Sequence, residues 1–184
     1  MPTPTVRLLS PTYDEHLVSY LAYIEVACIY HNKMVATFLP PVDNNKLLAH
    51  WREMIHEVSA GTRLIVIQLD ESEPRSAAEG GELKGVVMLR MPQTRTHIHQ
   101  GHLEKLMVHP SYRQRGAAKA MIQFLEVEAV NRRKKLIMLS TEVGSPAAKM
   151  YPKLGYVEYG TVPGCSIGLF RDPVDDVFFY KQLS

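Results

Sequence analysis

Short apolar runs of strand length alternate along the chain with segments whose apolar residues recur at helical spacing. Runs rich in Val, Ile and Leu predict strands, and spacings of three and four residues predict helices that bury one side. Strands are predicted at 6–9, 62–69, 84–91, 102–108, 135–141, 156–162 and 176–183. Helices are predicted from 12 or 14 to 30, after 43, from near 115 to 125, and from 145. The order β-α-α-β-β-β-α-β-α-β-β predicts an α/β fold with a mixed sheet and helices on both faces.

Local signals mark where several of these elements begin and end. Asp43 is predicted to cap the second helix, and Ser145 followed by Pro146 is predicted to open the last one. The segment 70–81 is rich in Glu, Ser, Pro and Gly, which predicts an exposed loop. The last two strands are predicted to be joined by a loop over 163–173.

The segment 101–123 organises the rest of the chain, with an apolar strand, a turn at Pro110 and a helix. Pro110 ends the strand because it has no N–H to donate to a neighbouring strand. The residues at 113–118 include a glycine and small side chains, and they open directly into the helix. Unpaired N–H groups at the positive end of a helix suit an anion such as a pyrophosphate. An ordinary strand-to-helix turn has the same spacing, so the loop by itself leaves both interpretations open.

Composition narrows the class of protein. With 184 residues, 46% hydrophobic and 22% charged, the chain is predicted to fold as one globular domain over 1–184. A formal charge of +2 argues against a dedicated nucleic-acid binder. No apolar run reaches the length of a membrane span, and the first residues lack the apolar core of a signal peptide, so a cytoplasmic location is predicted. Cys28 and Cys165 form no C-x-x-C pair, and His97, His99 and His102 lack supporting ligands, so no metal site is predicted.

The central segment also resembles a known motif. The strand end Leu106-Met107-Val108-His109-Pro110, followed by Arg113-x-x-Gly116-x-Ala118, is similar to the acetyl-CoA motif of the GNAT family of N-acetyltransferases. The resemblance covers nearly the whole chain and implies a mostly antiparallel central sheet of about seven strands. The C-terminal half is most similar to the tabtoxin-resistance acetyltransferases within that family.

The resemblance also implies how acetyl-CoA is bound. Backbone groups near the end of the strand would bind the pantetheine arm, at Leu106, Met107 and Val108. Backbone N–H groups of the next loop would hold the pyrophosphate, in the segment made of Arg113, Gln114, Arg115, Gly116, Ala117 and Ala118. The family prefers an Asn just before its last helix, but this chain has Gly144 and Ser145 there. Ser145 is predicted to contact the cofactor in place of that Asn.

Acetyl transfer to an amine requires a group that accepts the amine proton. His102 and Glu104 are candidates, because residues two apart on a strand share a face unless a bulge intervenes. The family commonly has Glu at the position of His102. The chain therefore leaves two alternatives open, with Glu104 acting either as the base or as the group that orients His102. A histidine with a purely structural role remains a third interpretation of His102.

The departing thiolate needs a proton donor, and Tyr151 is the candidate. Tyr151 stands in Ala147-x-x-x-Tyr151-x-x-Leu154-Gly155-Tyr156, which resembles the last motif of the family, where the hydroxyl lies near the thioester sulfur. The alternative is a tyrosine that only packs on an amphipathic helix.

Together these features predict an enzyme that transfers the acetyl group of acetyl-CoA to a small-molecule primary amine by direct attack in a ternary complex. Neither nucleic acid nor membrane is an expected partner, and the features are compatible with a homodimer. Two alternatives remain: a non-catalytic acyl-CoA-binding module, and an acetyltransferase whose acceptor is a protein amine.

Overall fold

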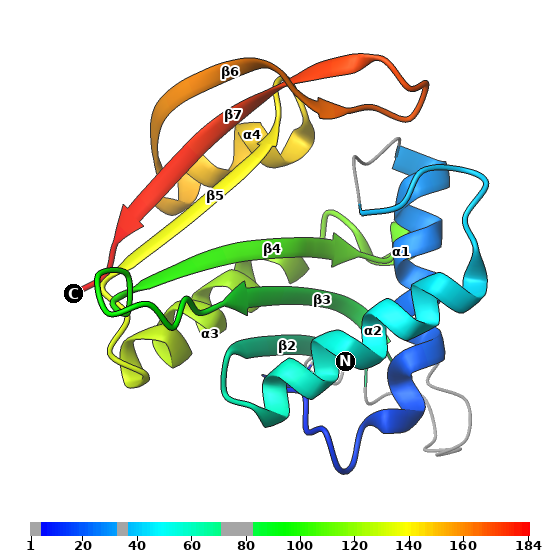
Figure 1. Ribbon diagram of the computed structural model, residues 1–184, viewed down its shortest axis with the longest axis horizontal. Coiled ribbons are helices and arrows are strands. Elements are labelled where there is room, and N and C mark those ends of the chain that lie inside the picture. Colours follow the sequence, from blue (N-terminus) through cyan, green and yellow to red (C-terminus); the bar gives the residue numbers. More distant parts are fainter. Residues whose placement is uncertain (1–4, 33–36, 71–82) are drawn as a thin grey trace.

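One sheet organises the computed structural model, which describes residues 5–32, 37–70 and 83–184. Its strands are β1 (Thr5–Leu8), β2 (Arg63–Leu69), β3 (Leu83–Arg90), β4 (Gln100–Val108), β5 (Leu136–Glu142), β6 (Val157–Ile167) and β7 (Pro173–Gln182). They lie in the order β1-β2-β3-β4-β5-β7-β6. Only β4 and β5 run parallel, and the other neighbouring pairs are antiparallel. The predicted mixed, mostly antiparallel sheet of seven strands is confirmed (Figure 1).

Helices cover both faces of this sheet, as the sequence predicts. The helices are α1 (Val18–Asn32), α2 (Asn44–Ser59), α3 (Ala117–Asn131) and α4 (Pro146–Met150), with 3₁₀ turns η1 (Glu15–Leu17), η2 (Pro110–Tyr112) and η3 (Tyr151–Leu154). Helices α1 and α2 lie on one face, while α3 and α4 lie on the other (Figure 1). Among the helices of the described ranges, none is both long enough and apolar enough to cross a membrane.

The two faces bury separate apolar cores, and this explains the sequence pattern of the central strands. Every residue of β2 is buried, as is every residue of β3 except Arg90, because helices cover both sides. Asp43 begins α2 as predicted, since its carboxylate accepts hydrogen bonds from the N–H groups of Asn45 and Lys46. The apolar side of α2 is then buried against the sheet through Leu47, Trp51, Met54 and Ile55.

Two predicted helix starts differ in detail from the structure. Helix α3 begins at Ala117 rather than near Arg115, because Gly116 adopts a left-handed conformation with φ of 81° and precedes the first helical turn. Asp14 does not cap α1 with its side chain. Its carboxylate is paired with the Arg7 guanidinium, at 2.6 and 2.7 Å, and also accepts from the Ser10 N–H.

The predicted loop over 163–173 is wrong. Strand β6 continues to Ile167, and β7 already begins at Pro173, so only a short turn joins them. Strand β6 lies at the edge of the sheet and has no outer neighbour. Pro163, which has no N–H to donate, is therefore tolerated there. Pairing between β6 and β7 shifts its register between Val162 and Ser166, which absorbs the Pro-Gly sequence. The loop predicted at 70–81 lies, after Asp70, outside the described residues.

Two irregularities of β4 create the space for a site. Its parallel pairing with β5 runs only from Gln100 to His102, after which the two strands separate. A bulge then shifts its register against β3, so that Lys105 and Leu106 face the single residue Val87. The carboxyl half of β4 therefore borders a cavity instead of a neighbouring strand.

Candidate active site

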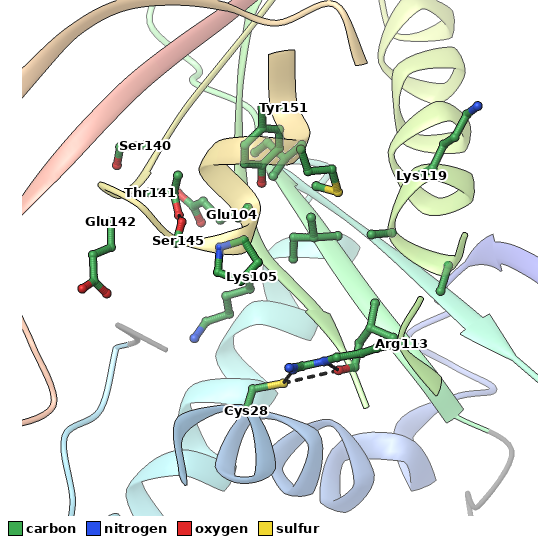
Figure 2. A pocket seen from close by; sticks show the side chains of 18 of the residues that line it. Cys28, Glu104, Lys105, Arg113, Lys119, Ser140, Thr141, Glu142, Ser145 and Tyr151 are labelled. Carbon is green, nitrogen blue, oxygen red and sulfur yellow. Dashed lines mark hydrogen bonds between the residues drawn. The ribbon is translucent and has the colours of Figure 1, made fainter. Parts of the chain in front are cut away.

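A cavity of about 800 Å³ lies where β4 and β5 separate (Figure 2). Its walls come from β4, the loop before α3, the end of β5, the start of α4 and the β6–β7 hairpin. The lining includes most of the predicted site residues, namely Glu104, Leu106, Val108, Arg113, Gln114, Gly116, Ala117, Ala118, Ser145 and Tyr151. The fold therefore brings together predicted site residues that lie up to 47 positions apart in the sequence, from Glu104 to Tyr151.

The amino end of α3 forms one side of this cavity. Ala117 and Ala118 lie in its first turn, where the backbone N–H groups have no acceptor within the helix. A Cβ placed on Gly116 would meet no atom within 4 Å, so this glycine borders open space. Arg115 is different, because its exposed guanidinium lies over the Tyr112 ring, outside the cavity lining. The site can thus present backbone donors and the positive end of a helix dipole to an anion.

Arg113 is directed into the protein. Its Nε donates to the Val108 carbonyl oxygen at 3.0 Å, and its Nη2 donates to the Cys28 Sγ at 3.3 Å (Figure 2). These bonds tie the loop before α3 to the end of β4 and to α1. Arg113 consequently shapes the loop that would receive an anion.

The side chains of the three β4 residues predicted to bind the pantetheine arm lie on two faces of the sheet. Leu106 and Val108 line the cavity, together with Leu103, whereas the Met107 side chain is buried in the core beneath α1 and α2. Met107 can therefore face a ligand in this cavity only through its backbone.

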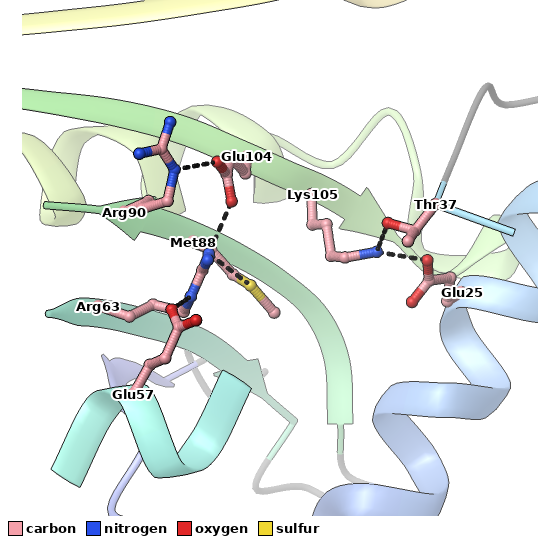
Figure 3. Close-up of polar contacts among 8 residues, drawn as sticks. All are labelled: Glu25, Thr37, Glu57, Arg63, Met88, Arg90, Glu104 and Lys105. Carbon is pink, nitrogen blue, oxygen red and sulfur yellow. Dashed lines mark hydrogen bonds and ion pairs between the residues drawn. The ribbon is translucent and has the colours of Figure 1, made fainter. Parts of the chain in front are cut away.

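Glu104 faces the cavity and is held by two arginines. Its Oε2 accepts from Arg63 at 2.7 Å and its Oε1 accepts from Arg90 at 2.9 Å, and Arg63 also pairs with Glu57 (Figure 3). Burial by itself would raise the pKa of the Glu104 carboxyl. The hydrogen bonds and charges of both arginines outweigh burial, so the pKa lies below its ordinary value. Glu104 is therefore a persistent carboxylate and a weak proton acceptor at neutral pH.

His102 lies on β4 but is not among the residues that line the cavity. It is half-buried on the part of β4 that still pairs with β5, and along this strand the residues that line the cavity start one position later, at Leu103. Because the bulge follows Glu104, His102 and Glu104 share one face, as predicted. Burial, and then the charge of Arg90, lower the pKa of His102 below its ordinary value of 6.5, while Glu104 opposes the shift. The imidazole is therefore neutral at pH 7 and able to accept a proton.

Tyr151 lies at the start of η3 and is only 3% exposed. Its ring packs against Tyr156 and Phe179, with centroid distances of 5.4 and 5.8 Å, and it also lines the cavity. Burial raises the pKa of the phenol, so the hydroxyl stays protonated over the physiological range. A phenol in this state can donate a hydrogen bond, although the raised pKa opposes complete loss of its proton.

Ser145 is used by the protein as a helix cap. Its Oγ accepts from the Ala148 N–H at 3.1 Å, as predicted for the residue that opens α4. The same hydroxyl lies 3.2 Å from the Thr141 hydroxyl at the end of β5. Both residues line the cavity, so the first turn of α4 is fixed against the end of β5.

Other lining residues were not identified from the sequence. Lys105 and Thr37 belong to this group, as do Cys28, Ser140 and Glu142. Ser140 and Glu142 could have been found, because they end a strand that runs parallel to β4 and ligands gather at such ends. Cys28 and Thr37 reach the cavity only through long-range packing, which no local pattern signals. Within the described residues, no cluster of His, Cys, Asp or Glu is arranged to hold a metal ion.

Comparison with known protein families identifies the class to which this site belongs. The pattern described as the acetyltransferase (GNAT) family matches residues 44–156, which is more than half of the chain and includes β4, α3 and Tyr151. The chain therefore belongs to the acetyltransferase (GNAT) family, an enzyme class that takes its acetyl group from acetyl-CoA.

Solved structures show the same fold at low sequence identity. A phosphinothricin acetyltransferase from Sinorhizobium meliloti, in complex with acetyl-CoA, superposes with a TM-score of 0.75 at 14% identity, covering 100% of this chain and 90% of that one. A ribosomal-protein-alanine N-acetyltransferase from Brucella melitensis gives 0.73 at 20% identity, covering 97% and 99%. An N-acetyltransferase from Staphylococcus aureus gives 0.73 at 15% identity, covering 100% of both chains. The fold is thus shared by acetyltransferases named for acceptors as different as phosphinothricin and the alanine of a ribosomal protein.

Proposed function

We propose that this protein transfers the acetyl group of acetyl-CoA to a small-molecule primary amine by direct attack in a ternary complex. The observation that carries the proposal is the separation of β4 from β5, which opens one cavity between a helix amino end and a set of titratable side chains. A single cavity of this kind allows the donor and the acceptor to be bound at the same time.

The cofactor fits the residues at the α3 end. The first-turn N–H groups at Ala117 and Ala118 would bind the pyrophosphate, and the β4 edge near Leu106 and Val108 would bind the amides of the pantetheine arm. When bound, acetyl-CoA supplies an activated acetyl thioester. This arrangement would place the thioester on the side of the cavity lined by Tyr151 and the end of β5.

Two carboxylates in the cavity lining support a cationic acceptor. Glu142 and Asp176 are register partners on β5 and β7, and both line the cavity. Asp176 is 6% exposed and accepts a hydrogen bond from the Ser166 hydroxyl at 2.7 Å. Like charges that face each other across a strand pair repel, and the ammonium form of an amine would relieve this repulsion.

Replacing Glu142 tests this part of the proposal. Glu142→Gln should raise KM for the amine roughly tenfold, equivalent to about 1.4 kcal/mol of binding, with little change in KM for acetyl-CoA. Initial rates with each substrate varied would separate the two effects. Glu158→Gln, on the exposed edge strand β6, is the matched control and should leave both constants unchanged. Equal effects of both substitutions would show that the Glu142 carboxylate does not bind the acceptor.

The proton chemistry is divided between neighbouring groups on β4. Glu104, fixed as a carboxylate by Arg63 and Arg90, would attract the protonated amine and orient His102. His102, neutral at pH 7, would accept the proton that the ammonium must lose before its nitrogen can attack the thioester carbon. The C–N bond then forms, the C–S bond breaks, and a second proton from the nitrogen balances the charge of the sulfur, so that CoA leaves as the thiol.

Tyr151 is proposed to stabilise the departing sulfur by donating a hydrogen bond. Tyr151→Phe should lower kcat roughly 100-fold, a loss typical of one donor that acts in the transition state. Tyr156→Phe is a suitable control, because Tyr156 is equally buried and packs on Tyr151 without lining the cavity. If single-turnover rates of Tyr151→Phe match wild type, Tyr151 has only a packing role.

Direct transfer also predicts that no cysteine is acetylated. Cys28 lines the cavity, but burial raises the pKa of its thiol despite the nearby Arg113, so little thiolate is present. Cys28→Ala should therefore retain kcat and should still give initial-rate plots that intersect. Loss of turnover together with an acetyl-cysteine adduct in the wild type, detected by mass spectrometry, would contradict direct transfer.

The class of acceptor can be determined by presenting two kinds of amine together. Small amines, including amino acids, arylalkylamines and polyamines, would be mixed with peptides that carry free N-termini and lysines, and the acetylated products identified by mass spectrometry. The proposal predicts acetylation of a small amine at the higher kcat/KM. Preferential acetylation of peptides would instead establish the protein-amine alternative.

A further inference from the structure

The bulge of β4 depends on one residue with an unusual backbone. Lys105 has φ of 50°, a left-handed conformation that residues other than glycine adopt rarely. Lys105 and Leu106 together face Val87 on β3, so this conformation accompanies the change of register. The bulge lies beside the cavity, and both of its residues line the wall.

Three partners hold the side chain of Lys105. Its Nζ donates to the Glu25 Oε1 on α1 and to the Thr37 Oγ1 at 2.9 Å (Figure 3). The other carboxylate oxygen of Glu25 accepts from the Trp51 Nε1 at 2.9 Å, and Nζ lies 5.9 Å from the centre of the Trp51 ring. These four residues are named here the Lys105 anchor.

The Lys105 anchor is buried and electrically paired. Glu25 is 0% exposed, and the Lys105 side chain is 12% exposed. A buried carboxylate is costly without compensating donors, and Lys105 and Trp51 supply one donor to each oxygen of Glu25. The strained backbone of Lys105 is therefore secured from outside β4, by α1, α2 and the segment that contains Thr37.

We propose that Lys105 is a positioning residue that holds the β4 bulge, and with it the cavity wall, in the arrangement that binds acetyl-CoA. This inference rests on the proposed function, in which the edge of β4 binds the pantetheine arm of acetyl-CoA. Backbone donors and acceptors bind a ligand well only when their spacing is fixed beforehand. Binding of acetyl-CoA along β4 would therefore change the surroundings of Trp51, because Lys105 and Trp51 share the carboxylate of Glu25.

The protein contains a reporter for this coupling, since Trp51 is its sole tryptophan. Titrating acetyl-CoA into the wild type should change the Trp51 fluorescence, with a midpoint that matches the dissociation constant from calorimetry. Lys105→Met should weaken acetyl-CoA binding about tenfold, within the usual range of coupling between adjoining groups, and should abolish the fluorescence response. Lys105→Arg, which keeps the charge, should recover part of both. Lys46→Met, on the exposed side of α2, should behave as wild type.

A merely structural role gives a different result. Lys105→Met would then lower the free energy of unfolding while the folded protein kept its acetyl-CoA affinity and fluorescence response, which would overturn the proposal. If Lys105→Met does not fold, Thr37→Val decides, because it removes one partner at an exposed position. Unchanged affinity and response in Thr37→Val would overturn the proposal. Failure of the wild type to bind acetyl-CoA would overturn the proposed function as well.

Discussion

Ala118→Glu should reduce the affinity for acetyl-CoA by at least about 100-fold, because like charges brought together at a binding site cost several kcal/mol. Ala118 is half-buried in the first turn of α3 and lines the cavity, so a carboxylate there would occupy the position proposed for the pyrophosphate. The substitution should not unfold α3, because a negative charge in the first turn of a helix is favourable. Calorimetry with acetyl-CoA measures the effect, and the thermal midpoint confirms the fold.

Ala120→Glu provides the matched control. It adds the same charge to the same helix, two residues further on, at an exposed position outside the cavity lining. Its affinity for acetyl-CoA should stay close to wild type. Ala118→Glu is a cleaner test than Gly116→Glu, since any side chain at Gly116 also strains a backbone with φ of 81°. Equal affinities of Ala118→Glu and wild type would exclude the amino end of α3 as the pyrophosphate site.

His102→Gln should lower kcat/KM roughly 10²- to 10⁴-fold if His102 is the general base. Only neutral imidazole accepts a proton, so the rate should rise with pH through the pKa of His102. That pKa lies below 6.5, because burial and Arg90 disfavour the charged ring, and the rate should therefore be level at pH 7. The His102→Gln profile should lack this rising limb.

Glu104→Gln discriminates between the two candidates. The Glu104 carboxylate raises the pKa of His102, so its removal should move the rising limb to lower pH without abolishing it. Acetyl-CoA affinity, measured by calorimetry, should be retained in both variants. If His102→Gln keeps the rate and the profile while Glu104→Gln loses them, the assignment is wrong and Glu104 is the base.

The sequence was informative where the structure depends on neighbours along the chain. The order of elements follows from local periodicity, and the helix caps at Asp43 and Ser145 act between residues two or three positions apart. The loop before α3 was located in the same way, since Pro110, Gly116 and the helical pattern are close together. In each case the signal and its partner lie within a few residues.

The features of the structure that the sequence did not predict depend on contacts between residues far apart in the chain. The sequence makes Glu104 a candidate base because no local signal points to Arg63, 41 residues earlier, or to Arg90 on the neighbouring strand. The Lys105 bulge has no local signal either, because its left-handed backbone is secured by Glu25, 80 residues away. The extent of β6 was underestimated because Pro163 normally argues against a strand, and only its edge position makes it tolerable.

Acetyl transfer within the cavity between β4 and β5 can be followed through the release of CoA. Free thiol would be measured with acetyl-CoA and a panel of small primary amines, for the wild type and Ala118→Glu side by side. We expect that at least one amine accelerates CoA release by the wild type and that Ala118→Glu loses this activity. Tight acetyl-CoA binding by the wild type, with no amine accelerating CoA release, would contradict this expectation and indicate a binding module without catalysis.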